Sequence, residues 1–294
     1  MPKAKKHRRK ASITSSSLTG VPLPSGSSSN PSSTRTFIRQ FHVLIKRKAQ
    51  LQRLLEEPRI RKFDEQDATR KELASIEREI TNLGGLETYQ RMSSIGQGND
   101  RGGGSEKVLI GWLNEFSEPQ RLCETNGRFK LLEVGALKHD NYAAHASWID
   151  NTPIDLHSRH PSIKEQDFLL LSEDQNRSKW DIISLSLVVN FVPEPKHRGR
   201  MLQLAHTMLR SDGYLFLALP LPCILNSRYM TPEHLQDLMQ NLGFTQMRSR
   251  WKEGGKMAYW LYKKTAIPSH RNLMPYQKKT VLRTGNRNNF CILL

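Results

Sequence analysis

The sequence of 294 residues is poor in cysteine and has no long apolar run. Its three cysteines, Cys123, Cys223 and Cys291, are far apart and form neither a zinc-binding pattern nor a disulfide framework, which is typical of a reducing compartment. The absence of about 18 consecutive apolar residues argues against a transmembrane helix. The basic N-terminus also lacks the apolar core of a secretory signal. We therefore expect neither a metal site nor a membrane span.

Acidic residues are scarce at both ends of the chain. Residues 1–34 carry six Lys or Arg and no acid, and residues 248–294 carry eleven against one acid. Residues 35–247 are nearly neutral, with 28 basic and 27 acidic residues, so the net charge of +17 lies almost entirely at the ends. Solubility alone does not require such clustering. Because clustered Lys and Arg neutralise phosphates and release counterions, the distribution favours a nucleic-acid partner.

The first 34 residues predict a disordered tail. Residues 3–10 read Lys-Ala-Lys-Lys-His-Arg-Arg-Lys, a run typical of a nuclear or nucleolar address or of a nucleic-acid-binding arm. The alternative is a solvated tail that is merely basic. Residues 11–34 are rich in Ser, Pro and Gly, and they offer too little apolar surface to offset the entropy of ordering.

Residues 35–95 predict a helical extension. We expect helices at 36–56 and 65–83, ended by Gly84-Gly85. One face of the second helix carries apolar residues at helical spacing, namely Leu73, Ile76, Ile80 and Leu83. The expected product is a hairpin packed on the main domain, and this packing role is favoured over a lid or an RNA-contacting arm. Residues 96–104 are glycine-rich and predict a linker rather than a phosphate-binding loop, because no strand precedes them.

Residues 105–294 predict a single α/β domain that ends in a basic segment. Strands are expected at 130–134, 152–156, 167–171, 181–189, 213–219, 244–250 and 257–263. Helices are expected at 106–117, 140–149, 196–210 and 231–242. This alternation predicts a Rossmann-like, mostly parallel seven-stranded sheet with helices on both faces. The short turn at Gly254-Gly255 makes the last two strands antiparallel, an order that matches class I methyltransferases.

Two of these expected strands end in a pattern typical of a nucleotide site. A ligand of an open α/β sheet binds at the carboxyl ends of the strands. Gly135 ends the first strand and lets the backbone approach a ligand, while Glu133 can hold the amino group of a methionine moiety. Asp155, twenty residues after Gly135, can accept both ribose hydroxyls. The alternatives are an ordinary strand-to-helix turn at Gly135 and a helix cap or turn at Asp155.

The next two strands add four polar or aromatic candidates. Asp167 stands where methyltransferases often read the adenine amino group, although a plain strand-start residue is nearly as good an interpretation. Ser186 and Asn190 mark the end of a long apolar strand, the place where a methyl group is delivered. Asn190 is the polar candidate to orient a base, and Phe191 can stack on one. The alternative for this loop is a wall of the cofactor pocket that does not touch substrate.

Seven stretches of the sequence carry a resemblance to a known family. They are residues 132–137, 154–158, 166–168, 184–193, 198–202, 213–220 and 288–292. Together they resemble the fungal methyltransferases that place a methyl group on N1 of an adenine in large-subunit (25S) ribosomal RNA. The resemblance covers roughly residues 36–294, and 184–193 is its most specific part.

The resemblance implies a nucleolar enzyme of ribosome biogenesis that uses S-adenosylmethionine, with large-subunit ribosomal RNA or a pre-ribosome as its partner. It implies that Gly135 and Asp155 are cofactor positions. Adenine N1 has a free lone pair, so alignment rather than a strong base is expected, and the absence of an Asn/Asp-Pro-Pro-Tyr/Phe motif argues against N6 methylation. An animal relative of the same fold looks like a sensor of S-adenosylmethionine. A non-catalytic sensor and a protein methyltransferase are therefore the alternatives.

The last four residues formally fit a second function. Cys291-Ile292-Leu293-Leu294 matches a prenylation box with basic residues upstream. The favoured alternative is a packed tail, because residues 290–294 are apolar throughout.

Overall fold

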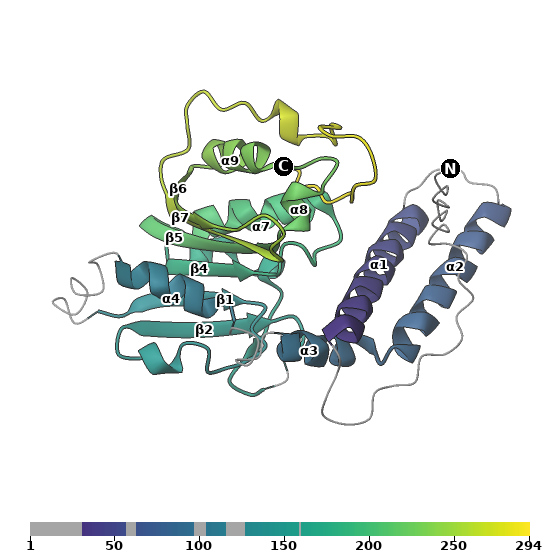
Figure 1. Ribbon diagram of the computed structural model, residues 1–294, viewed down its shortest axis with the longest axis horizontal. Helices are drawn as coiled ribbons and strands as arrows, with labels where there is room; N and C mark the ends of the chain where they lie inside the picture. The colour runs from purple at the N-terminus through teal and green to yellow at the C-terminus, as the bar shows by residue number, and fades with distance from the viewer. Residues whose placement is uncertain (1–30, 57–62, 97–103, 116–126, 159) are drawn as a thin grey trace, which may run out of the picture.

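The computed structural model describes residues 31–56, 63–96, 104–115, 127–158 and 160–294. The basic run at 3–10, Cys123 and nearly all of the 96–104 linker lie outside these residues. A sheet with its helices forms the body, and a pair of long helices projects from one side of it (Figure 1). The structure therefore has the two parts, a helical extension and an α/β domain, that the sequence pattern indicates.

The body is built on a seven-stranded sheet in the order β3-β2-β1-β4-β5-β7-β6. Its strands are β1 (Phe129–Val134), β2 (Ile149–Asp155), β3 (Lys164–Glu165), β4 (Trp180–Ser186), β5 (Leu209–Pro220), β6 (Phe244–Arg250) and β7 (Met257–Lys264). The first five strands pair in parallel, and β7 is antiparallel to both β5 and β6. This is the predicted class I methyltransferase topology, including the antiparallel closing pair.

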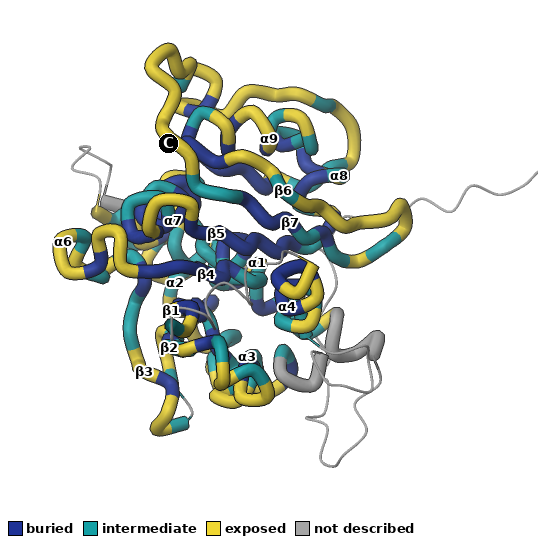
Figure 2. Tube along the Cα trace, turned by 90° about the vertical axis from the view of Figure 1, so that its left-hand side faces the viewer, coloured by how far each residue is buried: buried dark blue, intermediate teal, exposed yellow. Residues whose placement is uncertain are grey.

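Both faces of the sheet are buried, which explains the continuous apolar runs of the central strands. On one face, α7 (Pro195–Met208), α8 (Pro222–Leu225) and α9 (Pro232–Asn241) cover side chains such as Ile183 and Leu215. On the other, α4 (Glu106–Glu115) covers their strand neighbours Ile182 and Tyr214. Figure 2 shows the resulting band of buried residues along β4, β5 and β7. Successive residues of the central strands thus point to opposite faces of the sheet, and each face is covered by helices.

Two predicted elements are wrong. The helix expected at 140–149 is only a 3-10 turn, η2 (Ala143–His145), because β2 begins at Ile149 to pair with Phe129 of β1. The strand expected at 167–171 is also a 3-10 turn, η3 (Phe168–Leu170), which the side chain of Asp167 caps. The edge strand β3 lies just before it and has only two residues. In both places strand pairing and a side-chain cap override local propensity.

The projecting part consists of α1 (Pro31–Glu56), α2 (Phe63–Asn82) and α3 (Gly85–Gly96). We call these three helices the arm. The predicted apolar face is confirmed, since Leu44, Leu51 and Ile76 are buried together with Leu73, Ile80 and Leu83 packed beside them. Gly84 and Gly85 both adopt positive φ, so α2 ends there as predicted. Helix α3 was not expected, and the α1 helix begins within the predicted tail, at Pro31.

The C-terminal segment packs against the domain. After β7 the chain passes η4 (Met274–Tyr276), and residues 290–293 are buried. Arg198 donates to the carbonyl of Cys291, while the main-chain N–H of Leu293 donates to Pro195. Cys291 is only 2% exposed, which supports a packed tail rather than a prenylation site. Among the described residues, no helix combines the length and apolar character needed to cross a membrane.

Candidate functional site

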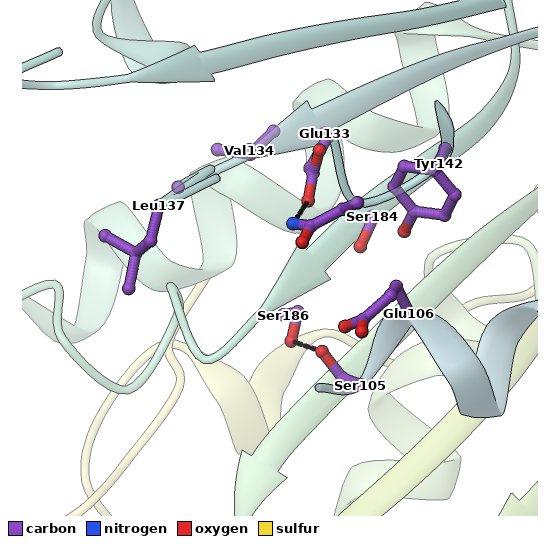
Figure 3. Close-up of a pocket in the computed structure, with 10 residues that line it drawn as sticks. Ser105, Glu106, Glu133, Val134, Leu137, Tyr142, Ser184 and Ser186 are labelled. Atoms are coloured by element: carbon purple, nitrogen blue, oxygen red, sulfur yellow. Dashed lines mark hydrogen bonds between the residues drawn. The ribbon is translucent and has the colours of Figure 1, made fainter. Parts of the chain in front are cut away.

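A pocket opens at the carboxyl ends of β1 and β4 (Figure 3). Its lining residues come from the start of α4, the end of β1 with the following turn, and the end of β4: Ser105, Glu106, Glu133, Val134, Gly135, Leu137, Asn141, Tyr142, Ser184 and Ser186. Three of the predicted residues, Glu133, Gly135 and Ser186, therefore meet at one pocket.

Glu133 is the buried acid of this pocket. Its carboxylate oxygens accept hydrogen bonds from the side-chain amides of Asn141 (2.6 Å) and Asn151 (2.9 Å). Burial raises the pKa of Glu133 from 4.5 to about 7, and the two amide donors offset this only in part. Glu106 and Asp140 raise the pKa further by charge repulsion. A half-neutral acid in a small pocket is suited to receive a cation, which would favour its ionised form.

Gly135 forms the turn after β1. Its φ of +76° lies in the left-handed region, where a side chain adds strain. A Cβ at this position would also meet Cγ2 of Val188 at 2.7 Å. The main-chain N–H groups of Gly135 and Ala136 both donate to the carbonyl of Ile154, at 2.8 and 3.0 Å. The glycine therefore lets the turns after β1 and β4 touch, and it ties the end of β1 to the end of β2.

Hydroxyl groups and a second acid, Glu106, form much of the remaining polar lining of the pocket. The Oγ atoms of Ser186 and Ser105 lie 2.5 Å apart, which joins the end of β4 to the start of α4. Tyr142 is 3% exposed, and its phenol is hydrogen-bonded to Ser184. Glu106, the first residue of α4, also faces the pocket. Sequence reasoning missed Ser105 and Glu106, which precede β1, and Tyr142, which lies where a helix was expected.

Asp155 ends β2 beside this pocket but does not line it. Its Oδ1 accepts from the main-chain N–H of His157 and from Nε2 of Gln90, each at 2.9 Å. The same Gln90 amide donates to the carbonyl of His157 at 2.8 Å. Gln90 lies on α3 and is 5% exposed. A second hollow next to Asp155 is lined by Leu86, Glu87, Gln90, His157 and Ser158. The arm thus reaches the predicted ribose-binding residue, which no sequence signal announced.

Asp167 lies further along the same edge of the sheet. Its carboxylate accepts from the main-chain N–H of Leu169 at 2.8 Å and caps η3. The residue is half-buried and lines neither hollow. Capping occupies one carboxylate oxygen of Asp167. The adenine-reading role of this residue stays a prediction.

The loop after β4 carries Asn190 and Phe191. Asn190 is 5% exposed, and its Oδ1 has no hydrogen-bond partner among the described residues. Phe191 is stacked on Tyr89 of α3, with ring centroids 4.9 Å apart, and lies 5.1 Å from the ring of His42 of α1. The predicted stacking residue therefore uses one ring face against the arm. Neither residue lines the pocket at β1 and β4.

The described part of the chain groups no three His, Cys, Asp or Glu side chains so that they could hold a metal ion. The pocket instead offers two acids, Glu133 and Glu106, several hydroxyl groups and a tight glycine turn. This inventory suits a polar organic ligand with a cationic group.

Comparison with known proteins identifies the family. Residues 74–292 match the family model of Bmt2, the 25S rRNA (adenine(2142)-N(1))-methyltransferases. The chain belongs to this family. The matched range includes the last nine residues of α2, all of α3 and all but the last two residues of the α/β domain.

Two curated relatives carry the same kind of name. The 25S rRNA adenine-N(1) methyltransferase of Schizosaccharomyces pombe is 36% identical over 267 residues, which cover 87% of this chain and 90% of the relative. The 25S rRNA (adenine(2142)-N(1))-methyltransferase of Saccharomyces cerevisiae is 34% identical over 227 residues, 76% of this chain and 64% of the relative.

Among solved structures, the chain is similar to a Burkholderia thailandensis 1,6-didemethyltoxoflavin-N1-methyltransferase with bound S-adenosylhomocysteine. The two are 15% identical, with a TM-score of 0.39 over 55% of this chain and 84% of the other. This likeness is too low to bear on function.

Proposed function

We propose that this protein transfers a methyl group from S-adenosylmethionine to N1 of an adenine in large-subunit (25S) ribosomal RNA. The observation that carries the proposal is the meeting of Glu133, Gly135 and Ser186 in one pocket, with Asp155 at the adjoining strand end, in a chain of the Bmt2 family. When bound, the cofactor supplies an activated methyl group with its own leaving group. The protein's task is then alignment of the acceptor nitrogen, which proximity can accomplish.

The pocket residues fit this cofactor. Glu133 offers a carboxylate to the cationic amino group, and the nearby Asn151 Oδ1 is a buried acceptor without a partner among the described residues. Asp155 Oδ1 is held by two donors, and Oδ2 meets no donor in the described part of the chain. That oxygen is the one we assign to the ribose hydroxyls.

Asn190 is the residue we assign to the target base. A buried acceptor without a partner costs about 1–3 kcal/mol, so Asn190 Oδ1 gains from any donor that reaches it. The exocyclic amino group of adenine is such a donor and is adjacent to N1. By accepting a hydrogen bond from this amino group, Asn190 Oδ1 would orient N1, and no proton would have to be removed from the base. A base whose pairing edge is read in this way must be unpaired or flipped out.

The turn between β6 and β7 is the surface we assign to the RNA. Met257 pairs with Pro220, the last residue of β5, so this turn lies at the same edge of the sheet as the pocket. Trp251 is 43% exposed there, between the exposed Arg250 and Lys252. Exposed aromatic and basic side chains together are suited to unpaired nucleotides, because bases stack on the ring and phosphates meet the charges.

Not all of the C-terminal charge is available for RNA. Arg283 donates to the main-chain carbonyls of Ile224, Leu225, Ser227 and Met230 at the end of α8 and beyond it. Lys264 Nζ donates to the carbonyl of Leu209 at 2.6 Å. Neutralising all basic residues of 263–287 would therefore damage the fold as well as RNA binding. Variants of the β6–β7 turn test RNA binding more cleanly.

We further infer that the protein acts in the nucleolus on a ribosomal precursor, where the target adenine is still accessible. The basic run at residues 3–10 supports this location. A fluorescent fusion should concentrate in the nucleolus and should lose that location when residues 3–10 are deleted. Exclusion of the full-length fusion from the nucleus would contradict the inference.

Methyl transfer in vitro tests the activity. The purified protein receives labelled S-adenosylmethionine and large-subunit RNA from cells that lack the gene, and the nucleosides are then separated. We expect labelled N1-methyladenosine, lost in Asp155→Ala but kept in Asp150→Ala, an exposed acid on the same strand. Tight cofactor binding without transfer to any RNA or protein would favour a non-catalytic sensor. Label on a protein would favour a protein methyltransferase.

A further inference from the structure

Gln90 is an arm residue buried against the cofactor edge of the sheet. Its side chain spans from α3 to the end of β2, where the two protons of one amide group bond to Asp155 Oδ1 and the carbonyl of His157. A polar side chain that is only 5% exposed must satisfy its hydrogen bonds within the protein. These two bonds therefore contribute both to the docked position of α3 and, through the bond to Oδ1, to the orientation of the Asp155 carboxylate.

Other contacts hold the arm at the same edge. Tyr89, next to Gln90 on α3, stacks on Phe191 of the loop after β4. The Nε2 atom of His42 on α1 lies within hydrogen-bond distance, 3.0 Å, of the Tyr89 hydroxyl. Further along α1, Arg53 pairs with Glu194 at 3.5 Å. The arm thus contacts the end of β2, which carries Asp155, and the segment after β4, which carries Asn190 and Phe191.

We propose that Gln90 is a positioning residue of the cofactor site, and that it couples S-adenosylmethionine binding to docking of the arm. Gln90 and the N–H of His157 fix Oδ1 of Asp155, which turns Oδ2 towards the ribose hydroxyls. Coupling of this kind is reciprocal, so a cofactor that needs the oriented carboxylate must also stabilise the docked arm. The inference rests on the proposed cofactor site, and it assigns to the arm a role beyond packing.

Protonation provides a readout that simple packing would not change. Burial raises the pKa of Asp155, whereas the N–H and charge of His157 and the Gln90 amide lower it. Glu165 faces Asp155 and raises the pKa, and Tyr89 also lies close enough to interact with the Asp155 charge. Losing the Gln90 donor should therefore raise the pKa of Asp155 further. As the pH is lowered, cofactor binding by the variant should be lost at a higher pH than binding by the wild type.

The test compares Gln90→Met, which keeps the length but has no donor, with a matched control, Gln40→Ala. Gln40 also donates to a carboxylate, that of Glu79 at 3.0 Å, but this bond lies within the arm. We expect about tenfold weaker cofactor binding by calorimetry for Gln90→Met, the scale of one hydrogen bond to a charged group, and no change for Gln40→Ala. The acid limb of the binding profile should move to higher pH only in Gln90→Met.

Two further measurements separate the possible failures. Adding Gln90→Met to Asp155→Ala should weaken binding no further, because a residue that acts through Asp155 has no effect once the carboxylate is gone. In the wild type, cofactor should slow amide exchange in α3. Normal binding and an unmoved pH profile in Gln90→Met would overturn the coupling while leaving the proposed function intact. Failure of the wild-type protein to bind cofactor would overturn both.

Discussion

Glu133 should link cofactor binding to proton release. The carboxyl is 7% exposed with a pKa of about 7, so about half of the free protein carries a proton there at neutral pH. The cationic amino group of S-adenosylmethionine favours the ionised form and lowers the pKa. Binding near pH 7 should therefore release about half a proton, and affinity should be about tenfold lower at pH 6 than at pH 8.

The same shift predicts how the free protein's stability varies with pH. The folded-state pKa lies above the ordinary value of 4.5, so the folded state holds the proton more tightly than the unfolded chain. The resulting stabilisation is complete below pH 4.5 and is lost as the pH rises to about 7. Its magnitude is about 3 kcal/mol, from 1.36 kcal/mol per pKa unit. Glu133→Gln, which cannot ionise, should remove this loss.

Calorimetry in two buffers with different ionisation heats measures the proton release, and urea unfolding from pH 5 to 8 measures the stability. Glu133→Gln should bind cofactor weakly at every pH and show no dependence between pH 6 and 8. Equal wild-type affinity at pH 6 and pH 8 would refute the assignment of Glu133 to the amino group. A pH dependence that persists unchanged in Glu133→Gln would show that another group titrates.

Three other predictions follow from packing and charge. Gly135→Ala should lower the free energy of unfolding, measured in urea, by about 2–4 kcal/mol, because of backbone strain and overpacking. Adding Val188→Ala to this variant should recover part of the loss. Strictly additive effects of the two substitutions on stability would contradict the proposed contact. Trp251→Ala should weaken RNA binding about tenfold in a filter assay without changing cofactor affinity, and unchanged RNA affinity would remove this residue from the interface. Arg283→Ala should cost about 2–3 kcal/mol, whereas exposed Arg271→Ala should lie within about 0.5 kcal/mol of wild type; equal effects would refute the structural role of Arg283.

The order and type of most elements could be predicted because periodicity reports burial directly. The apolar runs of β4 and β5 and the spacing along α2 need no distant partner to be recognised. The segments at 140–149 and 167–171 could not be predicted, because their own propensities favour structures that β1 pairing and the Asp167 cap prevent. Helix α3 was missed for a similar reason: two glycines mark the end of one helix, and only the tertiary structure shows another beginning there.

By itself, the sequence determined the fold class, the basic character of the chain ends and the strand-end residues that a cofactor needs. These features follow from local composition and from the rule that parallel strands end at one edge of a sheet. Only the tertiary structure decided that Ser105 reaches Ser186, that Asn141 and Asn151 hold Glu133, and that Gln90 holds Asp155. Such contacts join residues from separate elements, 65 positions apart for Gln90 and Asp155, and packing of the arm and helices against the sheet selects them.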